Sequence, residues 1–146
     1  MKKIYISSSW KNRTAVRAMA DRLRKEGHRV YDFTDPTTRK IPEMPPEEWP
    51  EKFDPSKHKW SEFTRHSKIY AAVMNNQEAI RWCDLVILLN PCGSDSHADW
   101  AFGVGLGKQS VVVGQPRAGE QTFTQLWADR ILDNPDDVYD WIRDNG

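Results

Sequence analysis

The stretch Asp84–Lys108 reads DLVILLNPCGSDSHADWAFGVGLGK and decides the fold. It begins with an unbroken apolar run, which is typical of a strand buried on both faces of a parallel sheet. A Pro-Cys-Gly-Ser turn follows, and a helix then begins with carboxylates close to its start. In open α/β sheets, ligands bind at the carboxyl ends of the strands. We therefore expect Asp95, Ser96, His97 and Asp99 to lie where this fold binds its ligand.

The segments on either side of this stretch alternate between strand and helix patterns. Strands are expected at 3–7, 28–33, 85–89, 110–114 and 130–132. Helices are expected from about 12 to 26, from 60 to 82 with a break near 67, from 96 to 107 and from 135 to about 144, with a helical turn at 122–127. This alternation predicts a doubly wound α/β fold in one domain spanning 1–146, with five parallel strands and 85–89 in the centre.

Three glycines in the deciding stretch have the spacing of a dinucleotide-binding fingerprint. That fingerprint joins a strand to the start of a helix, whereas Gly103, Gly105 and Gly107 lie where a helix ends. We interpret Gly103 and Gly105 as positions where the helix packs closely against the sheet. Gly107 is interpreted as the residue that ends the helix in a left-handed conformation.

Residues 34–56 form a Pro-rich segment that holds six of the nine prolines. Because proline lacks an amide hydrogen and fixes φ, we expect a long loop without regular structure. Long loops in compact domains are usually functional or disordered, and Trp49 and Phe53 argue against plain disorder. We predict that this segment closes over the ligand site as a lid or contacts a partner subunit.

Composition narrows the classes of function. Lys and Arg number 21, as do Asp and Glu, so the zero net charge provides no attraction for polymeric nucleic acid or an anionic membrane. The first residues are interpreted as a strand, because their apolar part is too short for a signal peptide. Cys83 and Cys92 favour a reduced, cytoplasmic protein. His58 and His66 match no metal-ligand spacing, and we expect neither a metal site nor a cofactor.

Three segments share their order and spacing with a known family. They read IYISSSWK at 4–11, NNQEAIRWCD at 75–84 and SDSHADWAFGVGLGK at 94–108. Together they resemble the nucleoside 2-deoxyribosyltransferase superfamily, which includes nucleotide N-glycohydrolases. The resemblance spans most of the chain. It implies a flavodoxin-like, Rossmann-like parallel sheet and a small-molecule nucleoside or nucleotide as the ligand.

The resemblance also implies a catalytic group. Asp99 matches the family's nucleophilic carboxylate, which is usually Glu, and Asn76 matches a position that is usually Asp. Breaking an N-glycosidic bond builds positive charge at the anomeric carbon, and a neighbouring carboxylate stabilises that charge or forms a glycosyl-enzyme. We therefore expect hydrolysis or transfer at this bond, with Asp99, Asn76 and Tyr5 as catalytic residues.

The alternative is a nucleotide-binding module that has lost this chemistry on the same fold. Asp99 is one methylene shorter than Glu, so the sugar would have to sit differently. Asn76 can hydrogen-bond a sugar hydroxyl but cannot relay a proton.

Eight further residues are candidates for substrate binding: Ser7, Ser8, Ser9, Trp10, Lys11, Asp95, Ser96 and His97. The serine turn holds a phosphate or simply caps a helix, and Asp95 is interpreted as a cap. Lys11 adds charge to the site or is solvated. Trp10 and Trp60 stack on a base or pack in the core. Tyr5 reaches the sugar site with its hydroxyl or only packs in the core. His97 and Cys92 lack the third group and oxyanion motif of a thiol hydrolase.

Members of the family are often oligomers in which a neighbouring chain helps to close the site. The resemblance therefore implies a homodimer or higher homo-oligomer. The chain also has seven tryptophans, more than a core of this size can fully bury. We expect the contact between subunits to use the helix from Lys68 to Trp82 and the helix that bears Trp100.

Overall fold

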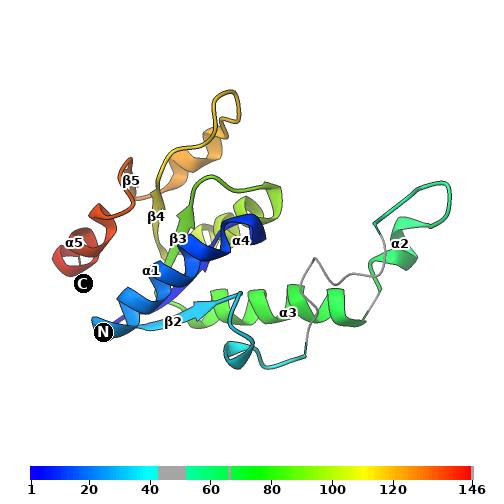
Figure 1. Cartoon of the computed structure of the whole chain (residues 1–146), viewed down its shortest axis with the longest axis horizontal. Helices are drawn as coiled ribbons and strands as arrows, with labels where there is room; N and C mark the ends of the chain where they lie inside the picture. The colour runs from blue at the N-terminus through cyan, green and yellow to red at the C-terminus, as the bar shows by residue number, and fades with distance from the viewer. Residues whose placement is uncertain (43–51, 66, 146) are drawn as a thin grey trace.

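The computed structural model describes residues 1–42, 52–65 and 67–145. One parallel sheet of five strands runs through the molecule in the order β2-β1-β3-β4-β5 (Figure 1). The strands are β1 (Lys3–Ser7), β2 (Arg29–Asp32), β3 (Leu85–Leu89), β4 (Gln109–Val113) and β5 (Arg130–Leu132). The doubly wound, flavodoxin-like α/β fold predicted from the sequence is confirmed.

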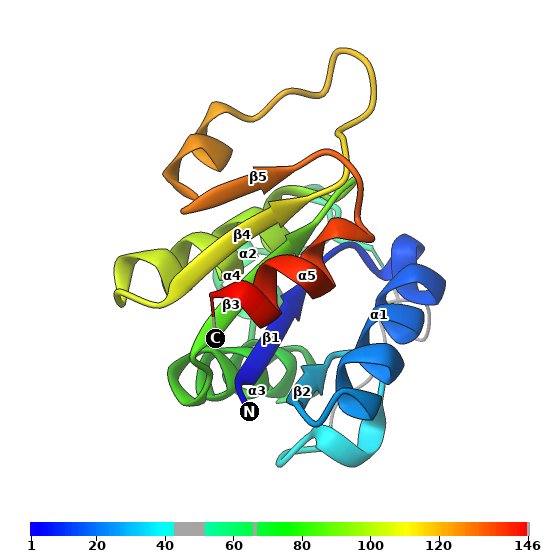
Figure 2. The ribbon, with the colours of Figure 1, turned by 90° about the vertical axis from the view of Figure 1, so that its left-hand side faces the viewer.

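Helices cover both faces of the sheet (Figure 2). One face packs against α1 (Arg13–Lys25) and α5 (Asp137–Asp144), and the other against α3 (Ser67–Trp82) and α4 (Ser94–Gly105). Shorter helical segments are η1 (Trp10–Asn12), η2 (Pro36–Thr38), α2 (Trp60–Phe63) and η4 (Phe123–Trp127). Figure 1 shows α2 beyond the N-terminal end of α3, away from the sheet. In the described part of the chain, no helix has the length and apolar character needed to span a bilayer.

The central strand is β3, as its apolar run predicts. All five of its residues are buried, and Val86 and Ile87 have no exposed surface. Successive side chains of a strand point to opposite faces, so Ile87 packs with α1 and α5 while Val86 packs with α3 and α4. A continuous apolar run is therefore required wherever helices cover both faces.

The glycines of α4 have different roles. A Cβ on Gly103 would lie 2.5 Å from Cγ1 of Val86, so α4 can approach β3 closely only without a side chain there. Gly107 has φ +79°, and the amides of Gly107 and Lys108 donate to carbonyls of the last helical turn, which is a Schellman motif. Gly105 has open space around it, which corrects the expectation that it too allows close packing.

Several boundaries differ from the sequence prediction. α4 begins at Ser94 rather than residue 96, and α5 begins at Asp137 rather than Pro135. The Pro-rich segment contains the short helix η2, because Asp35 accepts a hydrogen bond from the amide of Thr37 and thereby caps it. The break expected near residue 67 is present between α2 and α3. Trp49 and the middle of the predicted lid, residues 43–51, lie outside the described residues.

The tryptophans correct one expectation about the subunit contact. Trp100 has no exposed surface and packs between α4 and the sheet, so it cannot contribute to an interface. Trp60 and Trp127 are the tryptophans with exposed faces among the described residues, at 61% and 59%. The oligomeric state itself stays a prediction.

Candidate functional site

A cavity of about 1360 Å³ lies at the carboxyl edge of the sheet, and we call it the sheet-edge cavity. It is walled by the end of β1, by α2 and α3, and by the first turns of α4. Six residues expected from the sequence to share one cleft all line it: Tyr5, Ser7, Ser9, Asn76, Ser96 and Asp99. Ser8, Trp10, Trp60 and Asp95 line it as well.

Asp99 lies half-buried in this cavity, and its carboxylate is held from one side. The hydroxyl of Tyr5 donates to Oδ2 at 3.2 Å, and the amide Nδ2 of Asn76 donates to the same oxygen at 3.1 Å. The other oxygen, Oδ1, accepts no hydrogen bond from any of the described residues. Two donors therefore fix the orientation of the carboxylate and leave Oδ1 available to a ligand.

A second tyrosine orients Asn76. The hydroxyl of Tyr31 donates to Oδ1 of Asn76 at 3.3 Å, so the amide nitrogen of Asn76 must point to Asp99. The chemistry agrees: a carboxylate can only accept, so the amide nitrogen of Asn76 must face Asp99, which leaves its amide oxygen to accept from the Tyr31 hydroxyl. Tyr31 also stacks on Tyr5, with ring centroids 5.5 Å apart. The sequence analysis missed Tyr31; its pairing with Tyr5 across two parallel strands places it here.

The electrostatic environment matters for the chemistry of Asp99. Burial raises its pKa to about 6, the hydrogen bonds from Tyr5 and Asn76 oppose that rise, and the nearby charge of Asp95 adds to it. Burial and the Asp99 charge raise the pKa of Tyr5 well above its usual value, so Tyr5 remains a donor. At neutral pH, Asp99 is a carboxylate that is poorly solvated and correspondingly reactive toward developing positive charge.

The three serines at the end of β1 mainly hold the cavity wall together through hydrogen bonds. Ser7 donates to the carbonyl of Ser96 at 2.7 Å, and Ser8 donates to the carbonyl of Leu89 at 2.8 Å. Ser9 caps η1 by accepting from the amide of Lys11. Of the two interpretations drawn from the sequence, the capping role is the one visible in these hydrogen bonds.

Aromatic side chains form part of the remaining walls, and the charged side chains of the described lining carry a small net negative charge. Trp10 and Phe33 lie with ring centroids 6.0 Å apart, and Trp60 stacks on Phe63 at 6.1 Å. Such faces can hold a nucleobase by stacking. Among the described lining residues, Arg65 carries the positive charge, and Asp95 and Asp99 the negative charges.

Asp95 lies in the first turn of α4 rather than at its cap. The N-cap is Gly93, which makes no side-chain cap, so the capping interpretation of Asp95 is corrected. An acid in this turn is favoured by the helix dipole. Asp95 and Asp99 are four positions apart and therefore share the helix face toward the cavity.

Two substrate-binding candidates do not line the sheet-edge cavity. Lys11 is exposed outside it. His97 lies on another face of α4, with Nδ1 2.7 Å from the carbonyl of Gly93 and Nε2 2.9 Å from the side-chain amide of Gln125. Gln125 also exchanges hydrogen bonds with Asn90, so His97 belongs to a structural network behind the site.

Cys92 lies near His97 but is not poised for nucleophilic chemistry. Its Sγ is 3.8 Å from Nδ1 of His97, while burial raises the pKa of the thiol to about 12. A thiol that stays protonated is a poor nucleophile. Within the described ranges, no three His, Cys, Asp or Glu side chains converge as metal ligands would.

Comparison with known proteins supports the fold. No family model matches the chain, and no curated protein matches it in sequence. A solved structure similar to it is a 2-deoxyribosyltransferase from the psychrotolerant bacterium Bacillus psychrosaccharolyticus. The TM-score is 0.63 at 18% sequence identity, and the match covers 92% of this chain and 88% of that one. The two proteins share the five-stranded parallel α/β fold.

Proposed function

We propose that the sheet-edge cavity cleaves the N-glycosidic bond of a nucleoside, with Asp99 as the group that acts on the anomeric carbon. The observation that carries this proposal is the Asp99 carboxylate in the cavity wall: two donors occupy Oδ2, while Oδ1 accepts no hydrogen bond from the described residues. The fold of the bacterial 2-deoxyribosyltransferase gives further support, since that protein is described as a biocatalyst for nucleoside synthesis.

In the proposed reaction, Oδ1 of Asp99 approaches the anomeric carbon as the bond to the base breaks. The base leaves with the bonding electron pair and takes up a proton from the solvent, and the carboxylate stabilises the positive sugar by forming a glycosyl ester. Tyr5 and Asn76 keep the carboxylate in place through Oδ2. Water or a second base then attacks the same carbon, which releases Asp99 and completes hydrolysis or transfer.

The charges of the lining favour a nucleoside over a nucleotide. Two acids and one arginine line the described walls, so a phosphate dianion gains less from this cavity than a neutral sugar does. The same negative lining stabilises the cationic character that develops at the sugar. We therefore infer that neutral nucleosides are the preferred substrates.

A substrate panel tests the function. Purine and pyrimidine ribonucleosides, their 2′-deoxy forms and the matching 5′-monophosphates are incubated with the protein, with and without a second free base. Chromatography is expected to detect released base from one or more nucleosides, and less from the monophosphates. A new nucleoside formed with the added base would identify transfer. Saturable binding without any release would support the alternative, a binding module without catalysis.

The pH dependence of release provides a second prediction. The carboxylate form of Asp99 is the reactive one, so kcat/KM is expected to fall as pH drops through about 6. Tyr5→Phe keeps the ring but removes a hydrogen bond that lowers the pKa of Asp99. The acid limb of its profile is therefore expected to move to higher pH.

The matched control for this profile is Tyr70→Phe. Tyr70 lines the same cavity without a hydrogen bond to Asp99, so its acid limb should coincide with that of the wild type. An unchanged limb in Tyr5→Phe would contradict the assignment of this limb to Asp99.

A further inference from the structure

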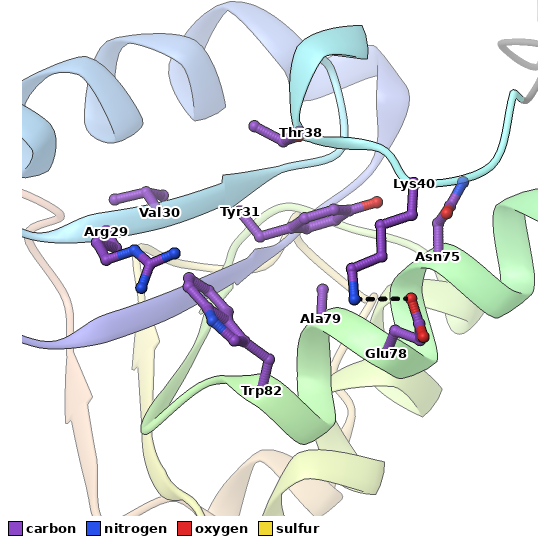
Figure 3. Close-up of a pocket in the computed structure, with 9 residues that line it drawn as sticks. All are labelled: Arg29, Val30, Tyr31, Thr38, Lys40, Asn75, Glu78, Ala79 and Trp82. Carbon is purple, nitrogen blue, oxygen red and sulfur yellow. Dashed lines mark ion pairs between the residues drawn. The ribbon is translucent and has the colours of Figure 1, made fainter.

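A second pocket, of about 280 Å³, lies between β2 and the C-terminal half of α3, and we call it the β2–α3 pocket (Figure 3). β2 is the edge strand of the sheet, so no further strand from the described part of the chain covers this side. Thr38 at the end of η2 and Lys40 in the loop after it complete the wall. None of the lining residues is shared with the sheet-edge cavity.

Two aromatic side chains form much of the wall. Tyr31 and Trp82 both line the pocket, and Ala79 lies beside Trp82 and below the Tyr31 ring in Figure 3. A flat ring is the shape that such aromatic faces hold well, because aromatic side chains bind planar heterocycles by stacking. The volume of the pocket suits a single heterocycle or a small nucleoside-sized molecule.

The charge at the mouth is positive. Lys40 and Glu78 form an ion pair at 3.4 Å, which leaves little net charge at that end. At the other end, the guanidinium of Arg29 lies 5.3 Å from the Trp82 ring. The backbone amide of Arg29 donates to the carbonyl of Lys2 at 2.9 Å. Its guanidinium makes no hydrogen bond or ion pair with the residues that the structure describes. A guanidinium already oriented by an aromatic ring presents its N–H groups to an anion in a favourable geometry.

We propose that the β2–α3 pocket binds a small aromatic anion, namely a flat ring that carries one carboxylate or phosphate group. The ring lies against Tyr31 and Trp82, and the anionic group pairs with Arg29. This site is independent of the proposed cleavage reaction. One side chain, Asn76, nevertheless connects the pocket to the proposed catalytic residue. The hydroxyl of Tyr31 in the pocket wall donates to Asn76, and Asn76 in turn donates to Asp99.

Fluorine NMR of protein labelled with 5-fluorotryptophan tests this proposal with one resonance for each of the seven tryptophans. Trp82→Phe identifies the Trp82 signal by its loss.

The labelled full chain is titrated with adenosine and uridine 5′-monophosphates and with nicotinate, and with the neutral partners adenosine, uridine and nicotinamide. We expect a saturable shift of the Trp82 resonance with at least one anion, and about tenfold or more weaker binding of its neutral partner. The anion that gives the shift distinguishes a phosphate source from a carboxylate source.

Two arginine variants provide the matched comparison. Arg29→Met is expected to weaken the Trp82 response about tenfold or more, and because Arg29 is exposed the fold should be retained. Arg22 also lies over an aromatic ring, 3.5 Å from the centroid of Tyr139, but outside the pocket. Arg22→Met should therefore bind like the wild type.

Three results would overturn the proposal. They are no shift of Trp82 with any of the anions, equal affinity for anion and neutral partner, and equal affinity of wild type and Arg29→Met. Ligands in the sheet-edge cavity act instead on the Trp10 and Trp60 resonances, since those residues line it. The cleavage reaction is tested by base release, whereas binding in the β2–α3 pocket is tested by the Trp82 resonance. Either proposal can therefore be refuted without the other.

Discussion

Asp99→Ala is expected to lower kcat for base release by at least about 10³-fold, because it removes the group proposed to act on the anomeric carbon. Nucleoside binding should change by less than about tenfold, since the aromatic walls and the serine turn that line the cavity remain. Chromatography under single-turnover conditions measures the rate of release. Isothermal calorimetry measures the dissociation constant on the same preparation.

Asp99→Asn separates chemistry from folding. The folded-state pKa of Asp99, about 6, lies above the ordinary 3.8, so the wild type loses stability as pH rises from about 4 through 6. The asparagine variant lacks this loss. Its free energy of unfolding at pH 7 should exceed that of the wild type by on the order of 1 kcal/mol after allowance for solvent screening, and the two should converge below pH 4.

These results together would show that Asp99 is retained at a cost in stability. A catalytic role would be contradicted if Asp99→Ala released base at the wild-type rate. A destabilised Asp99→Asn at pH 7 would contradict the raised pKa.

Gly103→Ala is expected to lower the free energy of unfolding by about 1–3 kcal/mol, which corresponds to roughly 3–10 °C in Tm. The added Cβ would lie 2.5 Å from Val86 in the central strand, where neither side can shift freely. The displacement also moves α4, which carries Asp99 one turn earlier. We therefore expect reduced kcat together with reduced stability, measured by thermal denaturation and by base release.

Gly105→Ala is the matched control on the same helix. A Cβ there meets nothing within 4 Å, and alanine favours a helix over glycine by up to about 1 kcal/mol. Its Tm should be unchanged or higher. Equal destabilisation by both variants would mean that the close approach of Gly103 to Val86 is not the cause.

The fold could be predicted from the sequence because its signals are local and strong. Leu85–Leu89 is an apolar run that only a doubly covered strand explains, and the residues after it must lie at the ligand-binding edge. The starts of α4 and α5 were less predictable. The first residue of a helix is predicted from a residue whose side chain caps the helix. The N-cap residues here, Gly93 and Asp136, make no side-chain capping hydrogen bond.

The convergence of Tyr5, Asn76 and Asp99 was predictable, since each falls in a segment that resembles the same family. Tyr31 was not, because its role depends on which strand pairs with β1. A sequence does not state that pairing, and only the register of Tyr5 with Tyr31 brings the second ring to Asn76.

His97 shows the limit of reasoning from proximity in sequence. It is two positions from Asp99, which on a helix is a turn of about 200°, so it contacts Gln125 instead of the cavity. Asp95, four positions away, does share the cavity face. The contact with Gln125 joins α4 to η4, and a local sequence pattern cannot predict a contact between segments so far apart in the chain.

The central claim is that a nucleoside binds with its sugar at Asp99, and a crystal structure of Asp99→Asn with a nucleoside that the wild type cleaves tests it most directly. The variant lacks the carboxylate and is therefore expected to leave the nucleoside uncleaved. Its side-chain oxygen can still accept hydrogen bonds from Tyr5 and Asn76. We expect the anomeric carbon within about 3.5 Å of the residue 99 side chain, and the base against the aromatic walls of the sheet-edge cavity. A nucleoside bound only in the β2–α3 pocket, or one whose sugar lies away from residue 99, would contradict the account.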